Sequence, residues 1–96
     1  MSELHFEWDS EKAEANFRKH GVSFQFAANV FDDPNRLEED DMFAESEYRV
    51  TVIGLAQARF LTVVYTDRSD GEREIIRLIS ARKSTPNEIR NYHGNC

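Results

Sequence analysis

The sequence contains few of the residue types that small proteins use for cross-linking or for binding metals. Its single cysteine, Cys96, cannot form an internal disulfide, and one thiol makes no metal site. Its three histidines, His5, His20 and His93, stand apart, without the spacing of a metal-binding motif. Its four glycines are isolated and form no phosphate-binding loop. We therefore expect neither a metal nor another cofactor.

Long apolar segments are also missing. No apolar run approaches the roughly 20 residues that a membrane span requires, so we expect no contact with a membrane. The first residues lack the basic start and apolar stretch of a signal peptide, which predicts a protein of the cytosol. A length of 96 residues with 40% apolar residues predicts one globular domain over residues 1–96.

Charge is unevenly distributed along the chain, whose net charge is −6. Residues 32–48 hold eight acids and one base, whereas residues 49–96 hold eight bases and five acids. A basic half can face nucleic acid. An acidic segment is either a solvated edge or a surface for a basic partner.

Local sequence signals predict a short strand followed by two helices. Alternating apolar residues over 4–8 indicate a half-buried strand. Asp9 is a suitable N-cap for a helix over 10–19, which Gly21 ends. Apolar residues at helical spacing then predict a second helix over 24–31. We expect both helices to lie on one face of a sheet.

The remaining elements are predicted to be strands and one final helix. Residues 36–41 favour a polar edge strand. Three longer strands joined by short connections are predicted over residues 48–55, 59–66 and 74–81. Thr85-Pro86-Asn87-Glu88 is a capping box that begins a short helix. The predicted class is α+β, with a mainly antiparallel sheet packed against two N-terminal helices and a short C-terminal helix.

The basic half and the helix ends carry side chains suited to metal-free cleavage of RNA. That reaction needs a base for the 2′-hydroxyl, a cation for the phosphate and an acid for the leaving oxygen. Arginine is the preferred phosphate clamp because its planar fork binds two oxygens. The candidates are Lys19 and His20 at a helix end, Arg68 and Glu72 around a turn, and Arg77 and Arg82 along the last strand. Lys83 lies at a strand–helix junction suited to anions, and Tyr65 can stack on a base.

Each candidate also has a structural interpretation. His20 can cap a helix, and Lys19 can complement the helix dipole. Arg68 can face solvent, and Tyr65 can belong to the core. Arg77, in the middle of a strand, is either paired in a partly buried site or part of a functional surface.

Six blocks of the sequence, in this order, resemble the BrnT toxins. They are Phe6-Glu7-Trp8-Asp9, the segment from Asn16 to Phe24, Ala27 with Val30-Phe31-Asp32-Asp33-Pro34, the segment from Arg49 to Leu55, Val63-Val64-Tyr65-Thr66-Asp67-Arg68, and Arg77-Leu78-Ile79-Ser80-Ala81-Arg82-Lys83. One block alone is a weak signal, but six blocks in the same order over nearly the whole chain are fairly specific.

The resemblance implies a toxin of a type II toxin–antitoxin system with a RelE-like fold. Such a protein cleaves RNA without a metal cofactor, inhibits translation and growth, and is neutralised by a BrnA-type antitoxin. The complex contacts operator DNA only through the antitoxin. For this chain the resemblance implies Arg68 and Arg82 at the phosphate, His20 or Glu72 in proton transfer, Lys19 in electrostatic support, and Arg77 facing RNA.

Two alternatives from other classes remain. A non-catalytic module would keep the toxin scaffold, bind the antitoxin and act only in operon repression, although the retention of every basic candidate argues against it. A DNA-binding domain is disfavoured because no predicted helix is basic along one face.

Overall fold

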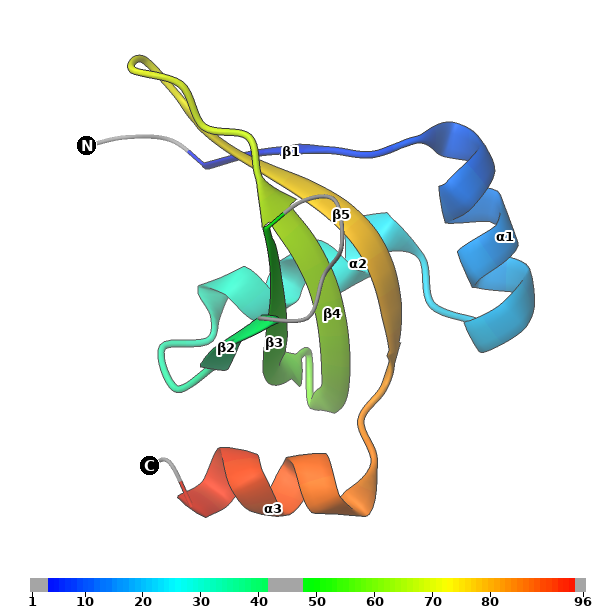
Figure 1. Cartoon of the computed structure of the whole chain (residues 1–96). Helices are drawn as coiled ribbons and strands as arrows, with labels where there is room; N and C mark the ends of the chain where they lie inside the picture. The colour runs from blue at the N-terminus through cyan, green and yellow to red at the C-terminus, as the bar shows by residue number, and fades with distance from the viewer. Residues whose placement is uncertain (1–3, 42–47, 95–96) are drawn as a thin grey trace.

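The fold is a five-stranded mixed sheet with helices beside its edge, behind it and across one end (Figure 1). The computed structural model describes residues 4–41 and 48–94. The elements in chain order are β1 (Leu4–Glu7), α1 (Ser10–His20), α2 (Phe24–Ala27), the 3-10 helix η1 (Ala28–Asp32), β2 (Leu37–Asp41), β3 (Arg49–Ala56), β4 (Arg59–Asp67), β5 (Glu74–Lys83) and α3 (Pro86–Gly94). None of the helices in this described part is long and apolar enough to cross a membrane.

The strand order is β1-β5-β4-β3-β2. Strands β3, β4 and β5 form the predicted antiparallel meander, and β2 pairs antiparallel with β3 at one edge. β1 runs parallel to β5 at the other edge. The predicted α+β class with a mainly antiparallel sheet is therefore confirmed. We call the end of the sheet with the β3–β4 turn, residues 57–58, the α3 end, and the end with the β4–β5 turn, residues 68–73, the turn end.

The prediction of two N-terminal helices on one face is only partly correct. The second predicted helix is the four-residue α2, which continues as the 3-10 helix η1. Short 3-10 stretches are common at the end of a helix, and Asp33 is already extended before Pro34. In Figure 1, α1 lies beside the β5 edge, whereas α2 and η1 lie behind the sheet.

The predicted signals at the ends of α1 act as expected. The Asp9 carboxylate accepts a hydrogen bond from the Glu11 N–H at 2.8 Å, which satisfies a free amide of the first turn. Gly21 ends the helix with a φ of 71°, and its N–H donates to the Phe17 carbonyl. These two signals position Lys19 and His20 in the last turn of α1.

Asn16 joins α1 to the open edge of β5. Because β1 ends at Glu7, the far part of β5 has no neighbouring strand on that side. The buried Asn16 amide fills this place: its Nδ2 donates to the Ala81 carbonyl at 2.9 Å, and its Oδ1 accepts from the Ala81 N–H at 3.1 Å. The same Nδ2 also donates to the Val22 carbonyl. The side-chain amide of Asn16 therefore makes the two hydrogen bonds that one backbone residue of a neighbouring edge strand would otherwise make with Ala81.

The hydrophobic core lies between the sheet and the two short helices behind it. Its fully buried side chains include Phe24 and Val30 from the helices and Val52, Val63 and Leu78 from the three central strands. Gly54 allows η1 to approach β3 closely, because a Cβ at this position would lie 3.3 Å from the Val30 Cβ. The apolar residues that alternate along the strands therefore face α2 and η1.

Helix α3 lies across the α3 end of the sheet (Figure 1). Its predicted capping box is confirmed: the Thr85 N–H donates to Glu88 Oε1 at 2.8 Å, and the Glu88 N–H donates to Thr85 Oγ1 at 3.2 Å. Tyr92 is buried, and its hydroxyl donates to the Asp33 carboxylate at 2.8 Å. That carboxylate also accepts from the Leu55 N–H at 2.9 Å, so it connects α3, η1 and β3.

Candidate functional site

The sheet separates the predicted site residues into two groups at opposite ends. Arg82 pairs with Thr62 near the start of β4, whereas Arg68 and Glu72 lie in the exposed turn that follows β4. The six residue steps from Thr62 to Arg68 correspond to roughly 20 Å of extended strand. Since Arg82 is also directed toward α3, Arg68 and Arg82 do not form one phosphate clamp.

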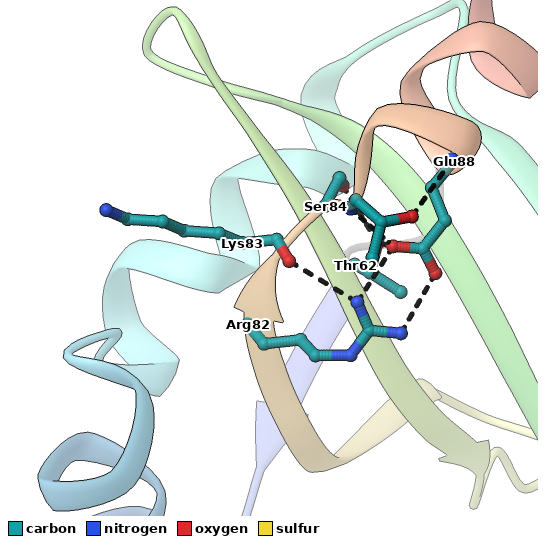
Figure 2. A network of polar contacts seen from close by, with 6 residues as sticks. Thr62, Arg82, Lys83, Ser84 and Glu88 are labelled. Atoms are coloured by element: carbon teal, nitrogen blue, oxygen red, sulfur yellow. Dashed lines mark hydrogen bonds and ion pairs between the residues drawn. The ribbon is translucent and has the colours of Figure 1, made fainter.

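Arg82 is the centre of a polar network at the α3 end (Figure 2). Its Nη1 and Nη2 donate to the two carboxylate oxygens of Glu88 at 2.8 and 2.9 Å. Thr62 donates to the same carboxylate at 3.0 Å and shares a hydrogen bond with Ser84. The hydrogen bond from Arg82 lowers the pKa of Glu88 to about 2, although burial opposes this shift. Arg82 thus joins β5 to the first turn of α3.

The Lys83 carbonyl accepts a hydrogen bond from Arg82 Nη1 at 3.3 Å, but the Lys83 side chain points away from this network, as Figure 2 shows. With Arg59 it borders two adjoining hollows at the α3 end. The first hollow, of about 240 Å³, has apolar walls that include Phe17, Phe26 and Leu61. The second hollow, of about 430 Å³, shares these two cations and is also lined by Phe60, Ser84 and Ile89. Neither hollow is lined by an acidic residue of the described part of the chain.

His20 directly precedes Gly21 and follows Phe17 by three residues, so it lies on the side of α1 that borders the first hollow. Lys19 is two positions from both of these lining residues, roughly 200° around the helix, so it lies on the other side of the same helix end. Lys19 is exposed and His20 is half-buried. We call Lys19, His20, Arg59 and Lys83 the basic rim. Three elements supply it: the end of α1, the start of β4 and the end of β5. Of the predicted site residues, Lys83 therefore borders the first hollow and His20 lies next to it, while Lys19 belongs to the same helix end.

Arg59 is the member of the basic rim that sequence reasoning missed. It begins β4 directly after the two-residue turn formed by Gln57 and Ala58, whose φ values of 48° and 72° are unusual for residues other than glycine. Its guanidinium carbon lies 5.6 Å from the ring centroid of Phe26, within range of a cation–π contact. The sequence signal that could have identified Arg59 is a cation directly after the tight turn between two strands, at the same end of the antiparallel meander as Lys83.

Arg77 lies in the middle of β5, on the sheet face that α2 and η1 do not cover. Its Nη1 is 2.7 Å from Glu7 Oε2, and both side chains are partly exposed. This ion pair joins β5 to the parallel strand β1. The structure thus shows the pairing that the sequence offered as one explanation for an arginine at this position.

Tyr65 is a core residue, with 8% of its surface exposed. Its ring centroid is 5.2 Å from that of Phe31, and its hydroxyl donates to Glu38 at 2.6 Å. Burial, reinforced by Glu38, raises the pKa of the Tyr65 hydroxyl. Little of the ring is open to a nucleotide base, so stacking by Tyr65 on a base stays a prediction.

The acidic residues are distributed along an edge and a turn. Glu38, Glu39 and Asp40 of β2 are exposed, while Glu45 and Glu47 of the same acidic segment lie outside the described residues. Within residues 4–41 and 48–94, no three His, Cys, Asp or Glu side chains are grouped closely enough to hold a metal ion.

Comparison with known proteins supplies the family. A search of curated proteins finds no match to the chain. A family model described as a ribonuclease toxin, BrnT, of type II toxin–antitoxin systems matches residues 8–88. This stretch includes the whole basic rim and the Arg82–Glu88 pair. The chain therefore belongs to the BrnT family of ribonuclease toxins of type II toxin–antitoxin systems.

Proposed function

We propose that the chain is a metal-independent, RelE-like endoribonuclease that binds its RNA substrate at the basic rim. The observation that carries the proposal is that Arg59 and Lys83 line a surface to which the described residues contribute no acid, and that the end of α1 with Lys19 and His20 adjoins this surface through Gly21. Such a surface attracts the phosphate backbone of RNA.

The rim contains the groups that cleavage at a 2′-hydroxyl requires. Histidine is the side chain best suited to proton exchange near neutral pH, so His20 is proposed to accept the 2′-hydroxyl proton. The 2′-oxygen then attacks phosphorus, the bond to the 5′-oxygen breaks, and the imidazolium returns its proton to that leaving oxygen. Arg59 and Lys83 are proposed to stabilise the charge on the phosphate oxygens, with Lys19 adding to the positive field.

The other predicted site residues receive different roles. Arg82 is proposed as a positioning residue, because its bonds to Glu88 fix the strand end that carries Lys83. Glu72 and Arg68 lie at the turn end, too far away to act on the same phosphate. For that reason His20 is preferred to Glu72 for proton transfer.

Membership of the family suggests the cellular location, the effect on growth and the partner that accompany this activity. We propose that the chain acts in the cytosol, where RNA cleavage inhibits translation and arrests growth. A BrnA-type antitoxin is the proposed partner that neutralises it, and the complex is proposed to reach operator DNA only through that antitoxin.

The test is cleavage of cellular RNA by the purified chain with EDTA present throughout. We expect cleavage by the parent, and a loss of about 100-fold or more for His20→Asn, the scale of general acid–base catalysis. The double variant Arg59→Ala/Lys83→Ala should bind RNA more weakly and with a smaller dependence on salt. Arg73→Ala, an exposed cation in the β4–β5 turn, is the matched control and should behave as the parent.

Two results would oppose the proposal. If His20→Asn keeps full activity, His20 is not the proton-transfer group. If EDTA abolishes cleavage by the parent, the cleavage is not independent of metal. A folded parent that binds the antitoxin but leaves RNA intact would favour the alternative, a non-catalytic module acting only in operon repression.

A further inference from the structure

The first hollow presents an apolar surface that the proposed RNA contacts do not use. Phe17, on its wall, is 55% exposed, although it lies directly after the buried Asn16 in α1. The Asn16 amide takes the inward position to bond with β5, which turns the neighbouring phenyl ring outward. A large exposed aromatic ring beside an apolar hollow is typical of a surface that a partner covers.

Among the residues that the structure describes, the charged side chains that line this apolar surface are all positive. Arg59 and Lys83 are the charged residues in the lining of the first hollow, and both also line the second. We call these two cations, which border both hollows, the Arg59–Lys83 ridge. A partner that combines apolar side chains with carboxylates would complement both properties.

We propose that the first hollow and the Arg59–Lys83 ridge bind an acidic, amphipathic segment of the antitoxin. A large apolar side chain of that segment would enter the hollow against Phe17 and Phe26, and its carboxylates would pair with the two cations of the ridge. The consequence for regulation rests on the proposed function: since the ridge belongs to the basic rim, the bound antitoxin would exclude RNA directly.

Phe17 distinguishes a protein occupant from RNA. RNA held by its phosphates needs the cations of the ridge but gains little from the apolar wall beyond them. A protein segment can desolvate the wall and the ridge together, so that a buried aromatic contact contributes strongly to affinity. Loss of the Phe17 ring should therefore weaken antitoxin binding while RNA cleavage persists.

The experiment measures the affinity of the purified cognate antitoxin for the parent and three variants by titration calorimetry. Phe17→Ala should weaken binding about tenfold or more, as expected for an aromatic anchor. Arg59→Ala/Lys83→Ala should also weaken binding and reduce its dependence on salt. Leu4→Ala is the matched control, since Leu4 is an exposed apolar residue of β1 at the other end of β5, and its affinity should equal the parent's.

RNA cleavage by the same variants separates the two proposals. Phe17→Ala is expected to cleave RNA as the parent does, and excess antitoxin should displace labelled RNA from the parent. Antitoxin affinity of Phe17→Ala equal to the parent's would overturn the docking proposal. Loss of RNA cleavage with intact antitoxin affinity would assign the hollow to RNA instead. If the parent cleaves no RNA, the proposed function fails, but the calorimetry still decides where the antitoxin binds.

Discussion

The Arg82–Glu88 pair should contribute measurably to stability, and Glu88→Gln tests this with little change in shape. The pKa of Glu88 falls from 4.5 to about 2, a difference that corresponds to roughly 3 kcal/mol at full strength. The Arg82 side chain is 40% exposed, so solvent screening reduces that value. We expect Glu88→Gln to lower the free energy of unfolding by about 1–2 kcal/mol at neutral pH, which is several degrees in Tm for a domain of this size.

The pH dependence of this effect has a definite sign. Because the pKa of Glu88 is lower in the folded state than in the unfolded state, its contribution is complete above about pH 4.5. It is lost as the pH falls from 4.5 toward 2. The difference in stability between the parent and Glu88→Gln should therefore shrink over that interval.

Urea denaturation of the parent and Glu88→Gln at several pH values measures both quantities. Glu39→Gln is the control, because Glu39 is an exposed acid on β2, away from the network. The reasoning is refuted if Glu88→Gln is no less stable than the control at neutral pH. It is equally refuted if the difference between Glu88→Gln and the parent does not change below pH 4.5.

Three further substitutions test contacts that hold the fold, each measured by urea denaturation. Asn16→Leu removes both hydrogen bonds to the β5 backbone and should cost about 2–4 kcal/mol, whereas Ala15→Leu on the exposed side of α1 should not. Ala58→Gly should raise stability by about 0.5–1 kcal/mol, because glycine relieves the positive φ at a smaller entropic cost; a loss would show that the turn is unstrained. Tyr92→Phe should cost about 1 kcal/mol by removing the bond to Asp33, and unchanged stability would mean that this bond has no net effect.

Local chemistry made the element boundaries predictable from the sequence. An N-cap at Asp9, a left-handed glycine at Gly21 and the capping box at residues 85–88 each act through neighbours a few residues away. The prediction over residues 24–31 was wrong in part because the fully buried residues, Phe24, Ala27 and Val30, follow the three-residue spacing of a 3-10 helix rather than the i, i+3, i+4, i+7 spacing of an α-helix. Val30 also lies close to Gly54 of β3, a contact between distant residues that local sequence does not reveal.

The candidate site depended on contacts between distant parts of the chain, which one sequence does not show. Glu7 and Arg77 are 70 residues apart, and nothing near either residue indicates their ion pair. The capping box was visible, but the second role of Glu88 as the partner of Arg82 was not. The separation of Arg68 from Arg82 was predictable, however, because an antiparallel hairpin places the start of one strand beside the end of the next.

A net charge of −6 disfavours binding to RNA, which is itself a polyanion. In the structure, however, the exposed acids of β2 and the cations of the basic rim lie apart. The exposed acids Glu38, Glu39 and Asp40 belong to β2, and Asp40 pairs with Val50 near the turn end of the sheet. The basic rim lies at the α3 end, and the strands between the two ends span roughly 20 Å, more than two screening lengths at physiological salt. RNA approaching the rim therefore meets the local positive field rather than the average charge of the chain.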